Sequence, residues 1–352
     1  MKEKEAWMLY NLIMKLSILF CFLISSVLFS QTKIEGNVYD FNKEPLSGTS
    51  VYIDGTTIGT TTNELGYFSL EIPLSSNSVL IVRNIGFKTH FIELQKISSS
   101  LHIFLDEDVK ELKEVVVEKT YFSRDQMLKL FKEQFLGTNA AGKSCVIENE
   151  DDLYFDYDRK KMTINVYSDQ PLIINNKYLG YKIEFQLVDF QCKFIKFGMK
   201  SEYVNQILYA GNSLFVESNS SNKILKRRQK SFEGSTLHFF RNFITNTWDK
   251  SNFVLFNGSF QTEPKKHFKL EKLANEMYRV EVFSNSPIQL KNKFLAQFNM
   301  LYANKSQSKV IFHVNEFFVD AFGVHSDYDK IIFSGEISNK RVGDLLPSNY
   351  MK

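Results

Sequence analysis

The sequence carries almost no net charge. Its 43 Lys and Arg side chains nearly balance its 40 Asp and Glu side chains, which leaves a formal charge of +3 over 352 residues. Without the first thirty residues, 40 basic side chains face 38 acidic ones. Nucleic-acid-binding domains usually have a pronounced basic excess on one face. The composition therefore argues against a nucleic-acid partner.

The short motifs of two enzyme classes are missing. The chain contains no G-x-S-x-G nucleophile elbow and no G-x-G-x-x-G dinucleotide-binding turn. These patterns mark hydrolases with a Ser-His-Asp triad and dinucleotide-dependent enzymes, so neither class is indicated. Ser235 is better explained as the residue that caps a helix than as a nucleophile. The sequence predicts no catalytic residue and no cofactor.

Cysteine is scarce, with three residues in the whole chain. Cys21 follows Leu19 and Phe20 in an apolar run, where a lipoprotein signal requires small residues, so lipid attachment is not predicted. Cys145 and Cys192 remain. In an oxidising compartment they could pair, provided that their Cα atoms approach to about 6 Å. Two separate buried thiols are the alternative, and the sequence leaves both open.

The first thirty residues have the order of a secretory signal. Lys2, Lys4 and Lys15 precede the apolar run 16–29, and the small residue Ser30 follows it. A charged segment, an apolar segment and a small residue at the cleavage site define such signals. We predict cleavage after Ser30, export to the periplasm or the outer surface, and membrane contact only through this segment. An uncleaved anchor is the alternative, although a spanning helix needs about 20 apolar residues.

Aromatic side chains are abundant, with 33 Phe and 16 Tyr, and these residues suit half-buried pleated sheets. Residues 31–107 alternate apolar and polar side chains between turns. Val51 and Ile53 share one face of a strand, and Phe68, Leu70 and Ile72 alternate after the next turn. About seven such short strands predict a β-sandwich.

The order of turns and strands in residues 36–88 resembles the carboxypeptidase-like regulatory domain family. That resemblance implies a transthyretin-like seven-stranded β-sandwich of the kind found in many exported proteins of Gram-negative bacteria. The residues that carry it are Gly36, Pro45, Leu46, Gly48, Val51, Gly55, Thr56, Gly59, Thr60, Thr61, Gly66, Phe68, Ile85, Gly86 and Phe87. They cover about a quarter of the chain and imply a fold and an exported location.

Residues 108–122 are predicted to be a linker. The segment Glu111 to Glu118 resembles the connection between this sandwich and the plug of TonB-dependent receptors. About 230 further residues cannot form both a plug and a barrel of roughly 22 strands. The segment is therefore predicted to be a linker or an added edge strand, and docking on a TonB-type partner is a weaker alternative.

Residues 123–352 are predicted to form a larger β-rich domain with a few helices. Ser123 and Gln126 fit a capping box that opens a helix near 124–136. A second helix near 236–248 would carry Leu237, Phe240 and Trp248 on one face. Four segments, at 135–137, 179–183, 234–241 and 344–350, resemble a companion region of other exported proteins, which has no assigned chemistry.

The family name invites a metallocarboxypeptidase interpretation. Zinc peptidases hold the metal with a His and a Glu of an H-x-x-E pair and a distant His. His90 with Glu93 and His313 with Glu316 have this spacing, but the first pair falls on a predicted strand and the second falls in or just after one. Positions three apart in a strand point to opposite faces, so neither pair is predicted to bind one ion.

A basic run is the strongest local charge feature and supplies the candidate binding surface. The candidate residues are Lys223, Lys226, Arg227, Arg228, Lys230, His238 and Arg241. A solvated helix face, and a packed or capping role for His238, are the structural alternatives. The functional hypothesis is an anionic glycan or an envelope protein as partner. We predict an exported, non-enzymatic binding or assembly module of the bacterial cell envelope, and a hydrolase with an unrecognised site after Cys145 is the alternative.

Overall fold

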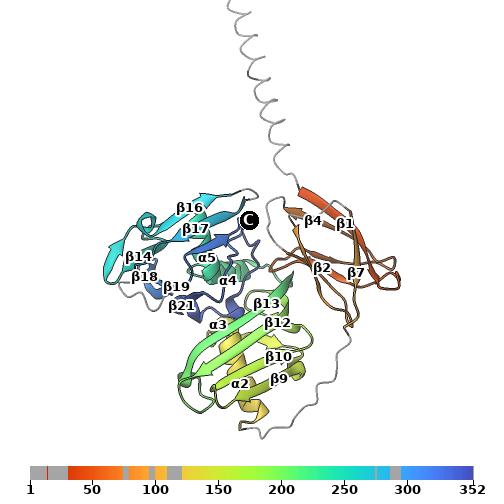
Figure 1. Ribbon diagram of the computed structural model, residues 1–352, viewed down its shortest axis with the longest axis horizontal. Coiled ribbons are helices and arrows are strands. Elements are labelled where there is room, and N and C mark those ends of the chain that lie inside the picture. Colours follow the sequence, from red (N-terminus) through yellow and green to blue (C-terminus); the bar gives the residue numbers. More distant parts are fainter. Residues whose placement is uncertain are drawn as a thin grey trace, which may run out of the picture.

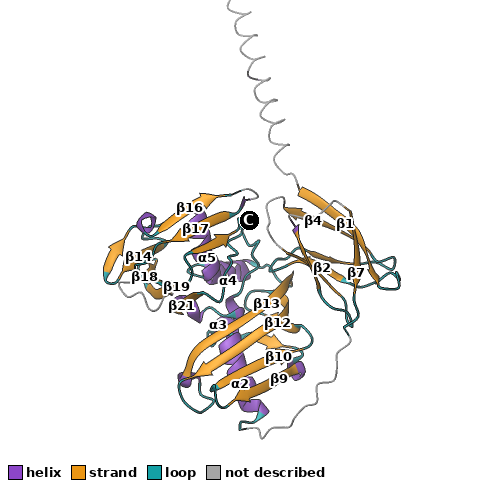
Figure 2. Ribbon diagram, in the orientation of Figure 1, coloured by secondary structure: helices purple, strands orange, loops and turns teal. Residues whose placement is uncertain are grey.

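The computed structural model describes Met14 and residues 31–73, 79–94, 100–108, 121–273, 276–285 and 295–351. Apart from Met14, the predicted signal segment lies outside the described residues, and so does the whole of the segment 111–118. Strands predominate over helices in the described parts, which confirms the predicted mainly β class (Figure 2). Among these residues, no helix combines the length and the apolar character that crossing a membrane requires.

The N-terminal strands form a sandwich of two sheets, seen at the right of Figure 1. One sheet has the order β4-β1-β7 and the other the order β3-β2-β5-β6. Ile34, Val51 and Leu80 lie in the core that the two sheets enclose. The predicted seven-stranded sandwich is confirmed. Its strands are β1 (Gln31–Asp40), β2 (Ser50–Ile53), β3 (Gly59–Thr61), β4 (Tyr67–Pro73), β5 (Val79–Arg83), β6 (His90–Glu93) and β7 (Ser100–Leu105).

Gly36 shows why this sandwich needs glycine at one strand position. It pairs with Phe68 of β4 on one side and with Leu101 of β7 on the other. A Cβ at this position would lie 2.5 Å from the carbonyl oxygen of Leu101 and 2.9 Å from the Phe68 ring. Glycine in a strand often marks such a close approach. Gly36 therefore allows the close packing between β1 and its neighbours.

The second group of strands is a six-stranded sheet covered by helix α2 (Figure 1). The capping box of Ser123 and Gln126 is present and opens α2. Phe131 and Phe135 of this helix are fully buried against the sheet, and the Phe131 ring lies 4.9 Å from Phe190. The elements are α2 (Arg124–Phe135), α3 (Ala140–Lys143), β8 (Cys145–Ile147), β9 (Leu153–Asp158), β10 (Thr163–Ser168), β11 (Leu172–Asn176), β12 (Tyr181–Phe194) and β13 (Val204–Glu217).

The third group holds helix α5 between two further sheets. Phe239 of α5 lies 5.5 Å from Phe333, and Phe243 lies 5.0 Å from Phe268. The elements are α4 (Asn222–Phe232), α5 (Thr236–Thr245), β14 (Phe253–Asn257), β15 (Phe260–Thr262), β16 (Phe268–Lys272), β17 (Tyr278–Val282), β18 (Ala296–Tyr302), β19 (Ser306–Phe312), β20 (Glu316–Val319) and β21 (Ile331–Gly335). Residues 123–352 thus contain two separate hydrophobic cores.

Two helix predictions need correction. Helix α5 ends at Thr245 because Asn246 has φ of 51°, a left-handed conformation that stops a helix. Trp248 therefore lies beyond the helix and packs back against Phe239 and Phe243. Helix α4 was not among the two helices predicted by range, although a solvated helix face was one interpretation of its basic run. Its low apolar content hides it, because only a narrow stripe of its surface is buried.

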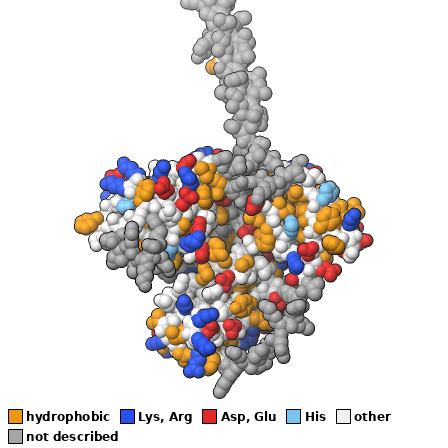
Figure 3. Space-filling model, viewed as in Figure 1, with side chains coloured by type: hydrophobic (Ala, Val, Ile, Leu, Met, Phe, Trp, Pro, Cys, Tyr) orange, Lys and Arg blue, Asp and Glu red, His pale blue; other side chains and the backbone are white. Residues whose placement is uncertain are grey.

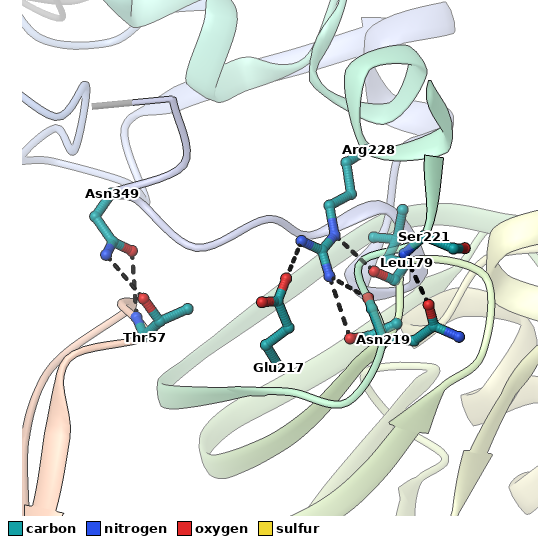
Figure 4. Close-up of polar contacts among 8 residues, drawn as sticks. Thr57, Leu179, Glu217, Asn219, Ser221, Arg228 and Asn349 are labelled. Atoms are coloured by element: carbon teal, nitrogen blue, oxygen red, sulfur yellow. Dashed lines mark hydrogen bonds and ion pairs between the residues drawn. The ribbon is translucent and has the colours of Figure 1, made fainter. Parts of the chain in front are cut away.

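The loop between β2 and β3 joins the sandwich to the rest of the chain. The Asp54 carboxylate accepts hydrogen bonds of 2.8 Å from the backbone amide of Ser213 and from the side chain of Asn212. The C-terminal segment reaches the same loop, where Asn349 exchanges two hydrogen bonds with Thr57 (Figure 4). Segments that are about 290 residues apart in sequence therefore meet at one joint.

Candidate functional site

The basic run of the sequence lies on helix α4. Lys223, Lys226 and Lys230 are exposed, and Arg227 is half-buried. The Arg227 guanidinium lies 4.5 Å from the centre of the Tyr178 ring, within the range of a cation–π interaction. Within the described parts of the chain, none of these four side chains forms an ion pair. The outer face of α4 therefore presents four cations without a carboxylate partner.

Arg228 does not belong to this exposed face. Its side chain is buried, and Nε donates to the carbonyl oxygen of Leu179 over 2.7 Å. Its Nη2 donates to the carbonyls of Gly180 and Asn219 over 3.2 and 2.7 Å, and Nη1 pairs with Glu217 (Figure 4). The charge of Arg228 faces the protein because these groups satisfy it there. Arg228 is a structural residue, which corrects the prediction that it lies on a binding surface.

Arg241 of helix α5 is also buried, beside the C-terminal segment that reaches the joint. Its Nε donates to the carbonyl oxygen of Phe322 over 2.8 Å. Nη1 and Nη2 donate to the carbonyls of Tyr350 and Ser348 over 2.9 and 2.7 Å. Burial lowers the pKa of Arg241 to about 10, which leaves it protonated at neutral pH. Arg241 holds the C-terminal segment in place and is not available to an external ligand.

His238 is packed among aromatic rings. Its ring stacks on Phe232 at 4.7 Å and lies 5.3 Å from Phe253. The backbone amide of Gly234 donates to Nδ1 over 3.2 Å, so Nδ1 is the unprotonated nitrogen. Ser235 accepts from the backbone amide of His238, as the predicted cap of α5. Of the two interpretations of His238, the structure supports the packed histidine.

Two half-buried histidines, His238 and His325, should make the protein acid-sensitive. Burial lowers the pKa of His238 and of His325 from 6.5 to about 4. His325 stacks on Phe240 with 3.8 Å between ring centres. Unfolding takes up protons at these sites, so their contribution to stability is complete above about pH 6.5 and is lost as the pH falls toward 4. We expect the melting temperature to fall over this range.

His325→Gln provides the test of this acid sensitivity. One titrating group contributes up to about 1.4 kcal/mol per pH unit to the slope of the unfolding free energy. We expect the variant to have a shallower slope than the wild type between pH 6.5 and 4, measured by urea unfolding at each pH. Carboxylates other than Asp327, whose pKa is lowered in part by the nearby His325, affect both proteins equally and cancel in the comparison. An unchanged slope would contradict the assignment to His325.

A polar cavity of about 570 Å³ lies beside α4. Lys230 and Tyr178 line it together with Lys340 and Arg341 from the C-terminal region. Lys340 Nζ donates to the carbonyls of Lys230 and Ser231 over 2.8 Å and so caps the end of α4. Tyr178, Lys340 and Arg341 were not candidate residues. Their distance in sequence from the basic run hid them, since no local pattern links these segments.

Glu133, Glu336 and Asp344 also line this cavity, and two of these carboxylates, Glu133 and Asp344, accept hydrogen bonds from neighbouring side chains. The Asp344 carboxylate accepts hydrogen bonds of 2.6 Å from the Ser231 hydroxyl and from the Asn139 amide. These bonds tie the segments around α3, α4 and the C-terminal region together. Asp344 therefore shapes the wall of the cavity. Of the cations that line it, Lys340 is bound to the end of α4, whereas Lys230 is exposed at the rim and can meet a ligand.

Residues 137–144, with the sequence GTNAAGKS, fit the letters of a phosphate-binding loop and also line the cavity, although they were not among the candidates. Such a loop lies between a strand and a helix. Here it follows helix α2, and α3 has only four residues. The backbone amides of Ala141 and Gly142 are bound by the Asn139 side chain. The fold does not give this segment the context of a phosphate loop.

The two His–Glu pairs and the two cysteines all lie within the described residues. In the ranges that the structure describes, no three His, Cys, Asp or Glu residues converge as metal ligands do. Cys145 and Cys192 are free thiols. Burial raises the pKa of each to about 12, so both stay protonated at neutral pH. A protonated thiol is a poor nucleophile and a poor metal ligand.

Comparisons with curated proteins and with solved structures give little support for any wider relationship. No curated protein matches the sequence. Among solved structures, a type II cohesin–X-dockerin complex from Acetivibrio cellulolyticus matches 21% of this chain and 56% of its own, at 18% identity and a TM-score of 0.18. A 9R-lipoxygenase from Cyanothece PCC8801 matches 63% of this chain and 49% of its own, at 8% identity and a TM-score of 0.18. These TM-scores are too low to argue a shared fold.

A family model gives the clearer result. The model described as the CarboxypepD_reg-like domain matches residues 34–117, which include the sandwich strands from Ile34 onward. The match agrees with the turns, the glycines and the seven strands seen in the structure. No family covers the remainder of the chain. Residues 34–117 therefore belong to the CarboxypepD_reg-like domain family.

Proposed function

We propose that this protein is an exported, non-enzymatic binding module of the bacterial cell envelope. Its ligand would be an anionic glycan or an acidic group on an envelope partner, held at the outer face of α4. The CarboxypepD_reg-like domain supports a binding or regulatory role. The basic face lies in the third group of elements, outside the family match.

This proposal rests on four cations of α4 that form no ion pair with any residue the structure describes. Lys226 and Arg227 are three and four residues after Lys223, and Lys230 is four and three residues after them, so the four side chains share one side of the helix. The acidic residue that follows the helix, Glu233, accepts a hydrogen bond from the Gln229 side chain. Paired surface charges contribute little to ligand binding, whereas unpaired ones create a field that attracts an anion. The face is therefore suited to a polyanionic partner.

Arg227 and Lys230 give this face its geometry. Stacking on Tyr178 restricts the Arg227 guanidinium, whose planar fork matches a carboxylate or a phosphate. Lys230 stands at the rim of the polar cavity. An acidic sugar chain could lie along α4 with one residue entering the cavity. The polar hydroxyl and amide groups of the cavity wall suit a sugar better than an apolar ligand.

Charge reversal on α4 tests this proposal. We expect the wild-type chain to bind polygalacturonate, and binding should weaken steeply as salt is raised because exposed charges are screened. Lys226→Glu combined with Lys230→Glu should weaken binding at low salt by at least about tenfold. Calorimetric titration measures both effects, and neutral dextran should not bind.

The control for this test carries the same charge change elsewhere. Lys250 and Lys305 are exposed and, within the described ranges, form no ion pair. Their double replacement by glutamate should leave polygalacturonate binding within about twofold of the wild type. Equal losses in the two double variants would refute a site on α4.

The exported location has its own test, which is sequencing the N-terminus of the protein purified from the native envelope. We expect the first residue to be Gln31, and a protein that keeps Met1 and lies in the cytosolic fraction would refute export.

A further inference from the structure

Two loops meet at one end of the six-stranded sheet. Thr163 pairs with Asp158 of β9 and with Lys193 of β12, so the β9–β10 turn lies beside the end of β12. These loops span residues 158–162 and 193–203. They contain six basic residues, namely Arg159, Lys160, Lys161, Lys193, Lys196 and Lys200, against the two acidic residues Asp158 and Glu202. The whole chain has a net charge of only +3, so the positive charge is concentrated here.

The two acidic residues of this end are already paired. Asp158 accepts from the backbone amide of Lys161 over 3.0 Å and pairs with its Nζ at 3.3 Å. Glu202 pairs with Lys200 at 3.9 Å. The other four cations are exposed, and no ion pair to them is found in the part of the chain that the structure describes. They are Arg159, Lys160, Lys193 and Lys196.

Large apolar side chains are exposed among these cations. Ile195 is 61% exposed and Phe197 is 51% exposed. Tyr121 joins them, and the Arg159 guanidinium lies 5.0 Å from its ring. Figure 3 shows Lys and Arg side chains, with hydrophobic ones between them, at the lower left of the lowest part of the molecule. Tyr121, Arg159, Lys160, Lys193, Ile195, Lys196 and Phe197 are called the loop-end patch below.

The aromatic side chains of the patch have a rigid support. The Phe197 ring lies 5.1 Å from Phe122 and 6.1 Å from Tyr157. The backbone amide of Ile195 donates to the carbonyl of Tyr203 over 2.9 Å, which closes the β12–β13 loop. Ile195 itself packs against none of the three cores. These ring contacts and this hydrogen bond fix the conformation of the loop, and the side chains of Ile195 and Phe197 remain exposed on it.

We propose that the loop-end patch docks on the surface of a lipid bilayer that contains anionic lipids. The cations would face the phosphates, and Ile195 and Phe197 would enter the interface. Basic side chains attract an anionic leaflet, and apolar tips add affinity when they leave water. An acidic protein would use the cations but would not require exposed apolar tips. This inference goes beyond the proposed function, and it departs from the expectation that only the N-terminal segment meets a membrane.

Vesicle sedimentation tests the proposal. The three cores lie between Ile34 and Leu346, so a chain that begins at Gln31 keeps every buried core residue. It also lacks the apolar run 16–29, which would bind vesicles by itself. We expect this chain to bind vesicles of phosphatidylcholine with phosphatidylglycerol. Pure phosphatidylcholine vesicles should bind it much more weakly. Equal binding to both kinds of vesicle would overturn the proposal.

Charge reversal separates the loop-end patch from the basic face of α4. Lys160→Glu with Lys193→Glu should reduce the partition coefficient on anionic vesicles by at least about tenfold. The matched control, Lys226→Glu with Lys230→Glu, carries the same charge change on α4 and should reduce it by less than about twofold. Equal losses would show a diffuse charge effect and overturn the proposal. Polygalacturonate binding responds to the α4 variant, so the two proposals fail separately.

Ile195→Ser tests the apolar part of the patch without changing charge. Its side chain is exposed, so the fold should persist, with an unchanged melting temperature as the check. We expect the partition coefficient on anionic vesicles to fall by about threefold to tenfold, as the loss of part of one buried aliphatic side chain predicts. Binding to poly-glutamate should not change. If Ile195→Ser binds vesicles as tightly as the wild type does, the apolar tip does not contribute. That result would point to an acidic macromolecule as the partner and overturn the proposal.

Discussion

Replacing Arg228 by methionine is expected to lower the free energy of unfolding by about 3–5 kcal/mol. The guanidinium donates to three backbone carbonyls, those of Leu179, Gly180 and Asn219. Methionine fills part of the space but donates no hydrogen bond, so the carbonyls are left without that donor. The expected effect is large because the side chain is almost fully buried.

Two further variants separate the hydrogen bonds of Arg228 from its charge. Arg228→Lys keeps the charge but cannot reproduce the fork, so an intermediate loss is expected. Glu217→Gln breaks the ion pair alone. Because the Glu217 side chain is 48% exposed, we expect a loss of at most about 1 kcal/mol. Urea unfolding followed by circular dichroism measures all three. A Glu217→Gln loss as large as that of Arg228→Met would contradict this account.

Arg241→Met should lower the free energy of unfolding by about 3–4 kcal/mol. Arg241 binds the carbonyls of Phe322, Ser348 and Tyr350 from the middle of α5. Without it, the C-terminal segment loses its anchor to the helix. This segment also contacts the sandwich, since the Ser348 amide donates to the Gly55 carbonyl over 2.6 Å. The variant should therefore loosen the joint as well as the α5 core.

Two measurements separate the effect of Arg241→Met on the α5 core from its effect on the joint. The fluorescence of Trp248 reports on the α5 core during urea unfolding, since its ring lies 5.0 Å from Phe243. Hydrogen exchange at the Ser348 amide reports on the joint and should become faster. The control Asn349→Ala removes two exposed hydrogen bonds to Thr57, with an expected loss of about 1 kcal/mol or less. Slow exchange at Ser348 in Arg241→Met would argue against the anchoring role.

The local features of the fold were predictable from the sequence. The turns and alternating strands predicted the sandwich, and the Ser123 and Gln126 capping box predicted the start of α2. Such features depend on residues that are neighbours in the chain, so their pattern is visible without a structure. The joint was not predictable in this way, because Asp54, Asn212 and Asn349 come from three distant segments.

The candidate binding surface shows the same division. A helical stripe of Ile224, Arg228 and Phe232 was present in the sequence, at spacings of four residues. That stripe could have indicated that Arg228 faces inward, but its positive charge argued for the opposite assignment. Long charged side chains are almost never fully buried unless they are paired. The partners of Arg228 come from segments that no local pattern associates with α4.

The sequence by itself determined the sandwich, the start of α2 and the presence of a basic run. Only the tertiary structure decided which of these cations face solvent. Arg227 and Arg228 are adjacent, yet about 100° of helical rotation separates their directions. Arg227 stacks on Tyr178 at the surface, whereas Arg228 meets buried carbonyls. Charge is a property of the residue, but its availability depends on the groups that the fold brings beside it.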